Sequence, residues 1–281
     1  MITDAQKEHV ERHAYLPEHL PDYVTAISRT EPFLFGNFIA YAGKGLLVFV
    51  GYPLDETFDE KRMQRHLEEA IRRLAPERVS LMAPSIPASL EKGDDFPPDR
   101  YYRLELPSAS SSPSQKTRNM LNRAGREISL GKSRRFGGEH AKLVEEFLKT
   151  RSVDDATRFI FRGIDRYLSA SETAWIFEAR TGGGELVAFD VAEFRPREYA
   201  LYMFNFSSED RYVPGASDLL LSEVMRQAVA SHKKYINLGL GINPGVAFFK
   251  EKWGGVAFFP HACRLYRPTR KGLLEMLLRS L

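Results

Sequence analysis

The stretch around Gly215 is where the sequence comes nearest to a ligand site. A strand-like segment leads there into a polar loop and then into a strongly helical segment. A helix N-terminus presents unpaired N–H groups and a positive dipole, which suit a pyrophosphate. The predicted donor-binding residues are Met203, Phe204, Arg211, Val213, Gly215, Ala216 and Ser217. The alternative is that Ser217 or Asp218 merely caps the helix.

Two acids in the strand predicted at Glu185–Phe194 are candidate general bases. Asp190 shares a face with apolar residues, so we expect a buried acid with a raised pKa, whereas Glu193 falls on the other face. A carboxylate beside an amine suits aminolysis of a thioester or ester. Asn205, in the next strand, could polarise a carbonyl, and Tyr202 could contact substrate and protonate a leaving group. Structural roles remain the alternative for each.

A run of cations lies between Gln115 and Arg135. It holds seven basic residues and one acid, a net charge of +6 against +3 for the whole chain. A local basic block favours an anionic partner. Three interpretations remain open: a solvated face, a site for an anionic acceptor such as a phosphorylated sugar precursor or lipid head group, and contact with nucleic acid, including charged tRNA. The predicted substrate-binding residues here are Lys116, Arg118 and Arg123.

Composition places the chain among globular proteins. It has 281 residues, 43% hydrophobic and 27% charged, enough for one large or two modest domains. We find no membrane-spanning run or signal core, so we expect a cytoplasmic protein, with peripheral membrane contact through a basic tail left open. The one cysteine, Cys263, is expected to be a structural thiol. We expect no metal cofactor, because the seven histidines are scattered without ligand spacing.

Elements in the same order surround these residues twice. In the first half we expect strands at 33–41, 46–51, 79–83 and 101–106 and a helix at 58–74. In the second half we expect strands at 173–179, 185–194, 199–206, 235–239 and 256–266, with helices at 139–150, 155–170, 219–231 and 246–253. This order predicts an α/β (α+β) fold of two halves in tandem, each a mixed sheet flanked by helices.

The expected boundaries follow from the connecting stretches. Residues 1–113 form the N-terminal half, 114–136 a basic connecting helix, and 137–281 the C-terminal half with the donor site. The Ser/Pro-rich stretch 107–114 has linker composition, and the tail 269–281 reads as an amphipathic helix.

Three motifs resemble a known group of acyltransferases. Val213-Pro214-Gly215-Ala216-Ser217 resembles the acetyl-CoA loop of the GNAT superfamily, with Gly215 at the first glycine, Ser217 at the last small residue and Tyr212 at the basic position. Phe249-Lys250-Glu251-Lys252-Trp253-Gly254-Gly255 resembles the FKxxWGG signature of Fem-like and cellulose-biosynthesis-like acyltransferases, which group with the C-terminal domain of phosphatidylglycerol lysyltransferases. The segment 115–124 resembles the basic helix between their two halves.

The resemblance implies a tandem GNAT fold and an N-acyltransferase. Such an enzyme would transfer an acyl or aminoacyl group from acyl-CoA or aminoacyl-tRNA to an amine of a small molecule or peptide, by direct attack. Lys250 would lie near the transfer centre, where an ammonium could stabilise an oxyanion or hold a phosphate; a surface lysine is the alternative. The predicted catalytic residues are Asp190, Glu193, Asn205 and Lys250. The alternative function is a catalytically silent GNAT-fold module that binds a phosphorylated or anionic ligand.

Overall fold

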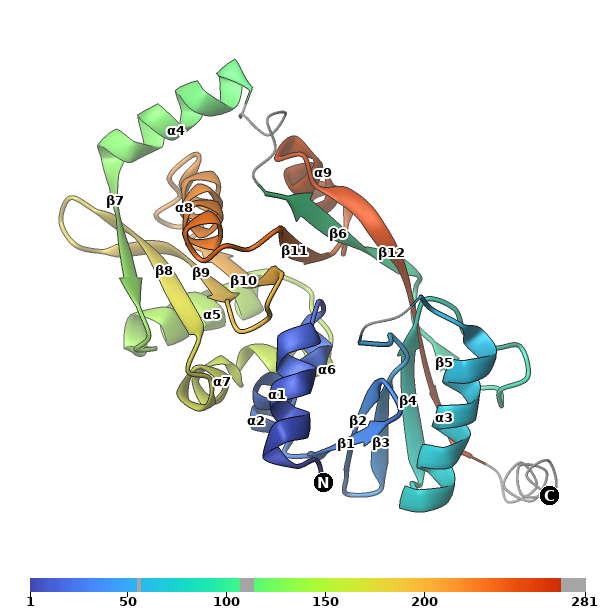
Figure 1. Ribbon diagram of the computed structural model, residues 1–281. Helices are drawn as coiled ribbons and strands as arrows, with labels where there is room; N and C mark the ends of the chain where they lie inside the picture. Colours follow the sequence, from blue (N-terminus) through green and yellow to red (C-terminus); the bar gives the residue numbers. More distant parts are fainter. Residues whose placement is uncertain (55–56, 107–113, 269–281) are drawn as a thin grey trace. The chain divides into compact units, whose positions relative to one another are not determined.

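The chain divides into two compact units. The computed structural model describes residues 1–54, 57–106 and 114–268 (Figure 1). Unit 1 comprises Met1–Tyr102, Leu240–Pro244 and the described residues from Ala257 onward; unit 2 comprises Arg103–Gly239 and Gly245–Val256. The sequence instead predicted boundaries at 113 and 136, because it gave no sign that the last strand returns to the first unit. The predicted linker at 107–113 and the tail helix at 269–281 lie outside the described residues.

Unit 1 is built on a mixed sheet with the strand order β1-β2-β3-β4-β12. These strands are β1 (Glu31–Phe35), β2 (Phe38–Gly43), β3 (Leu46–Val50), β4 (Arg78–Ala83) and β12 (Val256–Tyr266). β3 and β4 pair in parallel, and the other neighbouring strands pair antiparallel. The short β5 (Asp94–Asp95) pairs with β12, and β6 (Asp99–Glu105) leads from unit 1 into unit 2.

Helices cover both faces of the unit 1 sheet. α3 (Glu60–Leu74) connects β3 to β4 and buries an apolar stripe in a core that includes Phe38 and Phe49. The other face packs with the N-terminal segment, in a core that includes Tyr41 and Tyr52. Successive side chains of a strand point to opposite faces, so Phe38 and Tyr41 belong to different cores. The N-terminal elements are α1 (Asp4–His13), η1 (Pro17–His19) and α2 (Pro21–Ser28).

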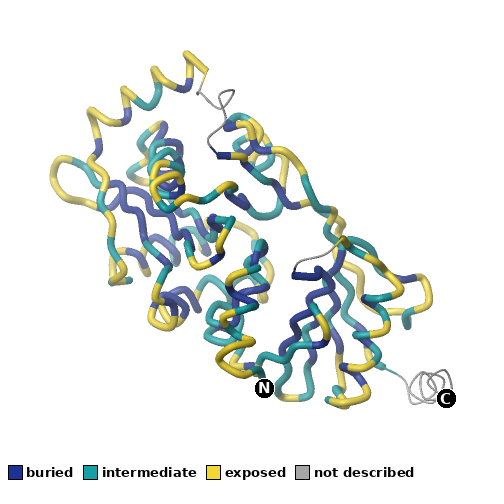
Figure 2. Tube along the Cα trace, viewed as in Figure 1, coloured by how far each residue is buried: buried dark blue, intermediate teal, exposed yellow. Residues whose placement is uncertain are grey.

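Unit 2 has a mixed sheet with the order β11-β10-β9-β8-β7. Its strands are β7 (Ile128–Ser133), β8 (Ala174–Thr181), β9 (Leu186–Glu193), β10 (Tyr199–Ser207) and β11 (Tyr235–Leu240). β7 to β10 run antiparallel in succession, and β10 pairs in parallel with β11 after the crossover helix α8 (Ala216–Ala230). β9 lies in the middle and is buried along its whole length (Figure 2).

The remaining helices of unit 2 flank this sheet. They are α4 (Gln115–Glu127), α5 (Gly138–Thr150), α6 (Asp155–Phe161), α7 (Ile164–Ala170) and α9 (Pro244–Lys252). Asp190 connects through Asn205 to Ser217 of α8, whereas its neighbour Phe189 stacks edge-on with His140 of α5. Because these neighbours point to opposite faces, α8 and α5 lie on opposite sides of the sheet.

The predicted α/β (α+β) class, with two mixed sheets flanked by helices, is confirmed. Three local predictions are wrong. The strand predicted at 33–41 breaks at Gly36, where a positive φ of 57° makes a turn between β1 and β2. β7 follows α4 directly, where no strand was predicted, and the helix predicted at 155–170 is two helices separated at Gly163.

Candidate active site

The start of α8 carries no side-chain cap. Its N-cap is Gly215, with φ of 87°, and no side chain bonds to the free N–H groups of the first turn. Ser217 Oγ lies instead 3.3 Å from Asn205 Nδ2, and Asp218 Oδ1 accepts from Trp253 Nε1 at 2.8 Å. The capping alternative is therefore wrong, and the positive end of α8 is left for another partner.

The basic helix α4 packs over this helix start. A Cβ added at Gly215 would lie 2.9 Å from Met120 Cγ and 3.4 Å from Ala124 Cβ. The predicted substrate-binding cations of α4 point outward and are exposed (Figure 2). Within the helix, Arg118 donates to Gln115 and Arg123 pairs with Glu127. The structure thus brings the basic face predicted from sequence next to the predicted donor loop.

The other predicted donor-binding residues lie along β10 and the loop that follows. Met203 sits where the register of β10 against β9 shifts, and Phe204 is buried beside it. The Val213 carbonyl accepts the Ala216 amide at 3.1 Å, which closes the turn before α8. Arg211 lies 3.9 Å from Glu185, so its charge is partly compensated.

A buried polar group links β9 to the start of α8. Asp190 is 0% exposed, and its Oδ1 accepts from Asn205 Nδ2 at 2.5 Å. Burial raises the pKa of Asp190 to about 7, which the Asn205 amide and the Tyr202 hydroxyl partly oppose. Asp190 Oδ2 and the Tyr202 hydroxyl are both buried without a well-oriented hydrogen bond to the described residues. Burial and the Asp190 charge also raise the pKa of Tyr202 well above its usual value, which keeps the phenol protonated.

Lys250 is buried, so the surface-lysine alternative is wrong. Its residue is 4% exposed at the end of α9. A Cβ added at Gly239 would lie 3.6 Å from Lys250 Nζ and 4.0 Å from the Tyr202 carbonyl oxygen. The amino group therefore lies close to both β10 and β11.

The two strands separate at this place. β10 and β11 pair through Leu201 and Asn237, and β10 then continues to Ser207. The register shift between Tyr202 and Phe204 follows directly, and Gly239 has a φ of 79°. The separation leaves room beside backbone groups of β10 that β11 does not pair, and Lys250 lies at its edge.

Glu193 lies apart from these residues. It is buried on the face of β9 opposite to Asp190, and its Oε2 accepts from Tyr167 at 2.9 Å and Ser171 at 2.7 Å. Its Oε1 accepts from the amides of the next two residues at 2.8 and 2.9 Å. Four hydrogen bonds fix this carboxylate in place. The structure thus brings Asp190, Asn205 and Tyr202 together and separates Glu193 from them.

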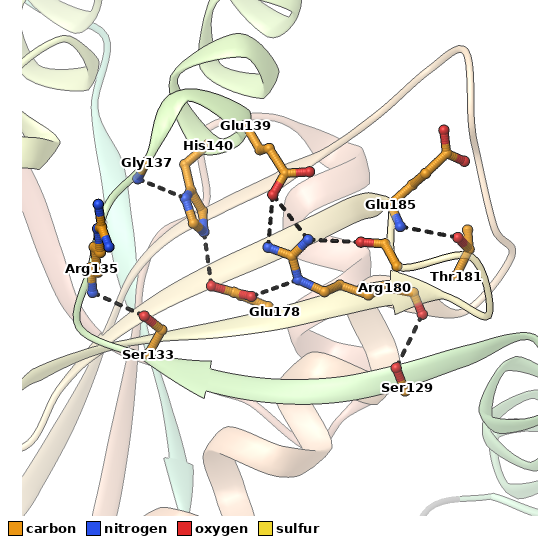
Figure 3. Close-up of polar contacts among 11 residues, drawn as sticks. Ser129, Ser133, Arg135, Gly137, Glu139, His140, Glu178, Arg180, Thr181 and Glu185 are labelled. Carbon is orange, nitrogen blue, oxygen red and sulfur yellow. Dashed lines mark hydrogen bonds and ion pairs between the residues drawn. The ribbon is translucent and has the colours of Figure 1, made fainter.

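A second polar network, which the sequence did not suggest, lies on the α5 side (Figure 3). The Gly137 amide donates to His140 Nδ1 at 3.0 Å, so Nε2 carries the proton and donates to Glu178 Oε1 at 3.1 Å. Glu178 Oε2 accepts from Arg180 Nε at 2.8 Å, and Arg180 also binds Glu139. Burial lowers the pKa of His140. Both ring nitrogens are occupied, so this network ties the start of α5 to β8 and offers no free base.

Sequence reasoning also missed the partners of Asp218. Trp253 is buried, as predicted for a structural residue, and Lys252 forms an ion pair with Asp218. In the part of the chain that the structure describes, no group of three or more His, Cys, Asp or Glu is placed to hold a metal ion. Within the same residues, no helix is long and apolar enough to span a membrane.

These two units, each with a helix crossing between parallel strands, define a tandem GNAT-like fold. Solved structures share it. FemX matches with a TM-score of 0.63 at 9% identity, covering 93% of this chain and 96% of its own. L-PGS from Bacillus licheniformis matches at 0.58 and 17%, covering 99% and 95%. A tandem GNAT protein from the clavulanic acid biosynthesis pathway matches at 0.51 and 12%, covering 82% and 78%.

The resemblance predicted from the motifs is therefore confirmed for the fold. No protein-family model matches the sequence, and the comparison with curated proteins finds no match.

Proposed function

We propose that unit 2 catalyses transfer of an acyl or aminoacyl group to an amine acceptor, from a donor whose carrier bears phosphates. The observation that carries this proposal is the buried Lys250 amino group at the point where β10 and β11 separate. Burying an amine is costly, so its retention beside unpaired strand backbone favours a role for its charge. The shared fold of FemX and L-PGS, whose names denote amino-acid-transferring enzymes, is consistent with this reaction.

The chemistry assigns a task to each group. The acceptor amine attacks the donor carbonyl carbon, and the ammonium of Lys250 stabilises the oxyanion that develops. The bond to the sulfur or oxygen of the carrier then breaks, and the leaving atom takes a proton from Tyr202, which is protonated at neutral pH. Asp190, with a pKa of about 7, recovers the proton that the amine loses. Asp190 is fully buried, so its proton is exchanged through Tyr202 or the Asn205–Ser217 pair.

The donor would place its phosphates at the uncapped start of α8. Backbone N–H groups and the helix dipole favour anions there, and the outward cations of α4 lie next to the same turn. Acyl-CoA and the 3′ end of an aminoacyl-tRNA both carry phosphates near the acyl group. The two donors differ in how many phosphates the basic face would contact.

A single-turnover assay with a panel of labelled acyl-CoAs and aminoacyl-tRNAs tests this proposal. We expect Lys250→Met to lower the transfer rate by about 10²- to 10³-fold, the usual loss for an oxyanion-stabilising group. Lys142→Met is the matched control, because Lys142 is exposed on α5 and pairs with Glu146. A folded Lys250→Met variant with undiminished transfer contradicts the proposal.

Salt dependence separates the donors. Neutralising Lys116, Arg118 and Arg123 together to Gln should reduce the salt dependence of binding by roughly one log unit per lost phosphate contact with a tRNA donor. The same change should leave an acyl-CoA donor nearly unaffected. Binding of either donor without turnover would support the silent binding module instead.

A further inference from the structure

We infer that Asp218 is a positioning residue that holds the end of α9 against the first turn of α8 and so fixes Lys250. The inference rests on the proposed function for its catalytic consequence, and on contacts within unit 2 for its structural part. Asp218 is buried in the first turn of α8, yet its carboxylate does not bond to its own helix. It accepts instead from Trp253 Nε1 at 2.8 Å and forms an ion pair with Lys252. Both partners lie at the end of α9.

The contacts continue from Trp253 to Lys250 through the backbone. The Lys250 carbonyl accepts the amides of Trp253 at 3.1 Å and of Gly255 at 2.9 Å. A Cβ added at Gly255 would lie 2.8 Å from Lys250 oxygen and 2.8 Å from Leu238 Cδ1, so this turn is packed closely on β11. A shift of Trp253 would therefore move the backbone that carries Lys250.

The ion pair also balances charge at the start of α8. An acid in the first turn of a helix would repel an anionic ligand at the same N-terminus. Lys252 compensates Asp218 locally and also lies over the ring of Phe249, 5.1 Å from its centre. The acid can thus anchor α9 without cancelling the positive end of α8. An acid that served only the helix dipole would not need to reach α9.

Hydrogen exchange and kinetics of Asp218→Ala and Asp218→Asn test the inference. Asn keeps an oxygen that can accept from Trp253 Nε1, whereas Ala removes both contacts. In Asp218→Ala we expect exchange in residues 246–256 to become at least about tenfold faster, because the turn loses its anchor. We expect kcat to fall about 10- to 100-fold with KM within about threefold, since misplacing a catalytic group by about 1 Å has effects of this size. Asp218→Asn should restore most of both quantities.

Glu223→Gln is the matched control, since Glu223 lies on the same helix and pairs only locally with Arg226. It should leave both measurements unchanged. Unchanged exchange in folded Asp218→Ala would overturn the inference. Faster exchange with unaltered kcat would support the anchoring but overturn the catalytic role of Lys250. If wild-type protein transfers no acyl group, the proposed function fails, and the exchange measurement still decides whether Asp218 holds α9.

Discussion

The two units contain the same crossover, and its helix begins differently in each. In unit 1, Asp59 caps α3, because its Oδ1 accepts the Arg62 amide at 2.6 Å. In unit 2, α8 begins at Gly215 with no side-chain cap. One helix satisfies its first turn from its own sequence, and the other leaves its N–H groups for a ligand.

The strands on either side of the helix differ in the same sense. β3 and β4 pair along Leu46–Val50, the full length of β3. β10 and β11 pair over Tyr199–Leu201 only, and Lys250 lies where they separate. A fully paired crossover contributes stability, whereas a crossover that stops pairing exposes backbone and space for chemistry. The comparison assigns the structural task to unit 1 and the reactive site to unit 2.

Each unit also buries an acid, and here too the surroundings differ. Glu18 Oε2 accepts from Tyr101 at 3.0 Å, and burial raises the pKa of Glu18. Asp190 leads through Asn205 to Ser217 in the first turn of α8. Only the acid of unit 2 is connected to a place where a ligand could bind.

The largest expected effect concerns Asp190. Its pKa is about 7 when folded and near 4 when unfolded, so the ionised carboxylate costs about 4 kcal/mol above pH 7 and nothing below pH 4. The free energy of unfolding should therefore fall as pH rises from 4 to 8, and Asp190→Asn should remove that component. Urea denaturation across this pH range measures it.

The matched change in unit 1 sharpens the comparison. Glu18→Gln should leave acyl transfer unchanged, whereas Asp190→Asn should slow it by about 10²-fold, as expected for loss of a general base. Equal losses of activity in both variants would remove the functional distinction between the units.

The second effect is the acid sensitivity of unit 1. Burial lowers the pKa of His19 to about 4, below the unfolded value of about 6.5, and its Nε2 donates to the Tyr52 carbonyl. The unfolded state then binds the proton first, so about 3 kcal/mol is lost as pH falls from 6.5 to 4. The difference between wild type and His19→Gln should shrink by this amount over that range, because Gln does not titrate. A constant difference between the two proteins would contradict this account.

The smallest effect compares the two helix starts directly. Asp59→Ala should cost about 1 kcal/mol by loss of a cap and leave donor binding intact. Gly215→Ala should cost about 1–3 kcal/mol, because alanine is strained at a φ of 87° and approaches Met120. It should also weaken the thermal stabilisation produced by the donor. Adding Met120→Ala should relieve the contact but not the backbone strain; full recovery would mean that φ is unimportant. A larger residue such as Trp at Gly215 would displace α4 and cannot test ligand binding cleanly.

Local patterns predicted much of this arrangement, and contacts across the fold did not appear in them. Alternation along β9 correctly predicted that Asp190 is buried, because its neighbours on that face are apolar. The burial of Lys250 was not predictable, since α9 is short and has lysines at both of its last even positions. The bond between Asp218 and Trp253 joins residues 35 apart, which no periodicity connects. β7 was missed because an exposed edge strand has no apolar run to mark it.

The return of the last strand to the first unit has a consequence for biosynthesis. Residues Ala262–Tyr266 of β12 pair with Val79–Ala83 of β4, so that edge has no neighbour until almost the whole described chain has been made. The ribosome delivers the N-terminus first, and an unpaired strand edge attracts other chains. The sheet of unit 2 can close before that of unit 1, the reverse of their order in the sequence. The nascent protein therefore depends most on chaperones while β4 waits for its last partner.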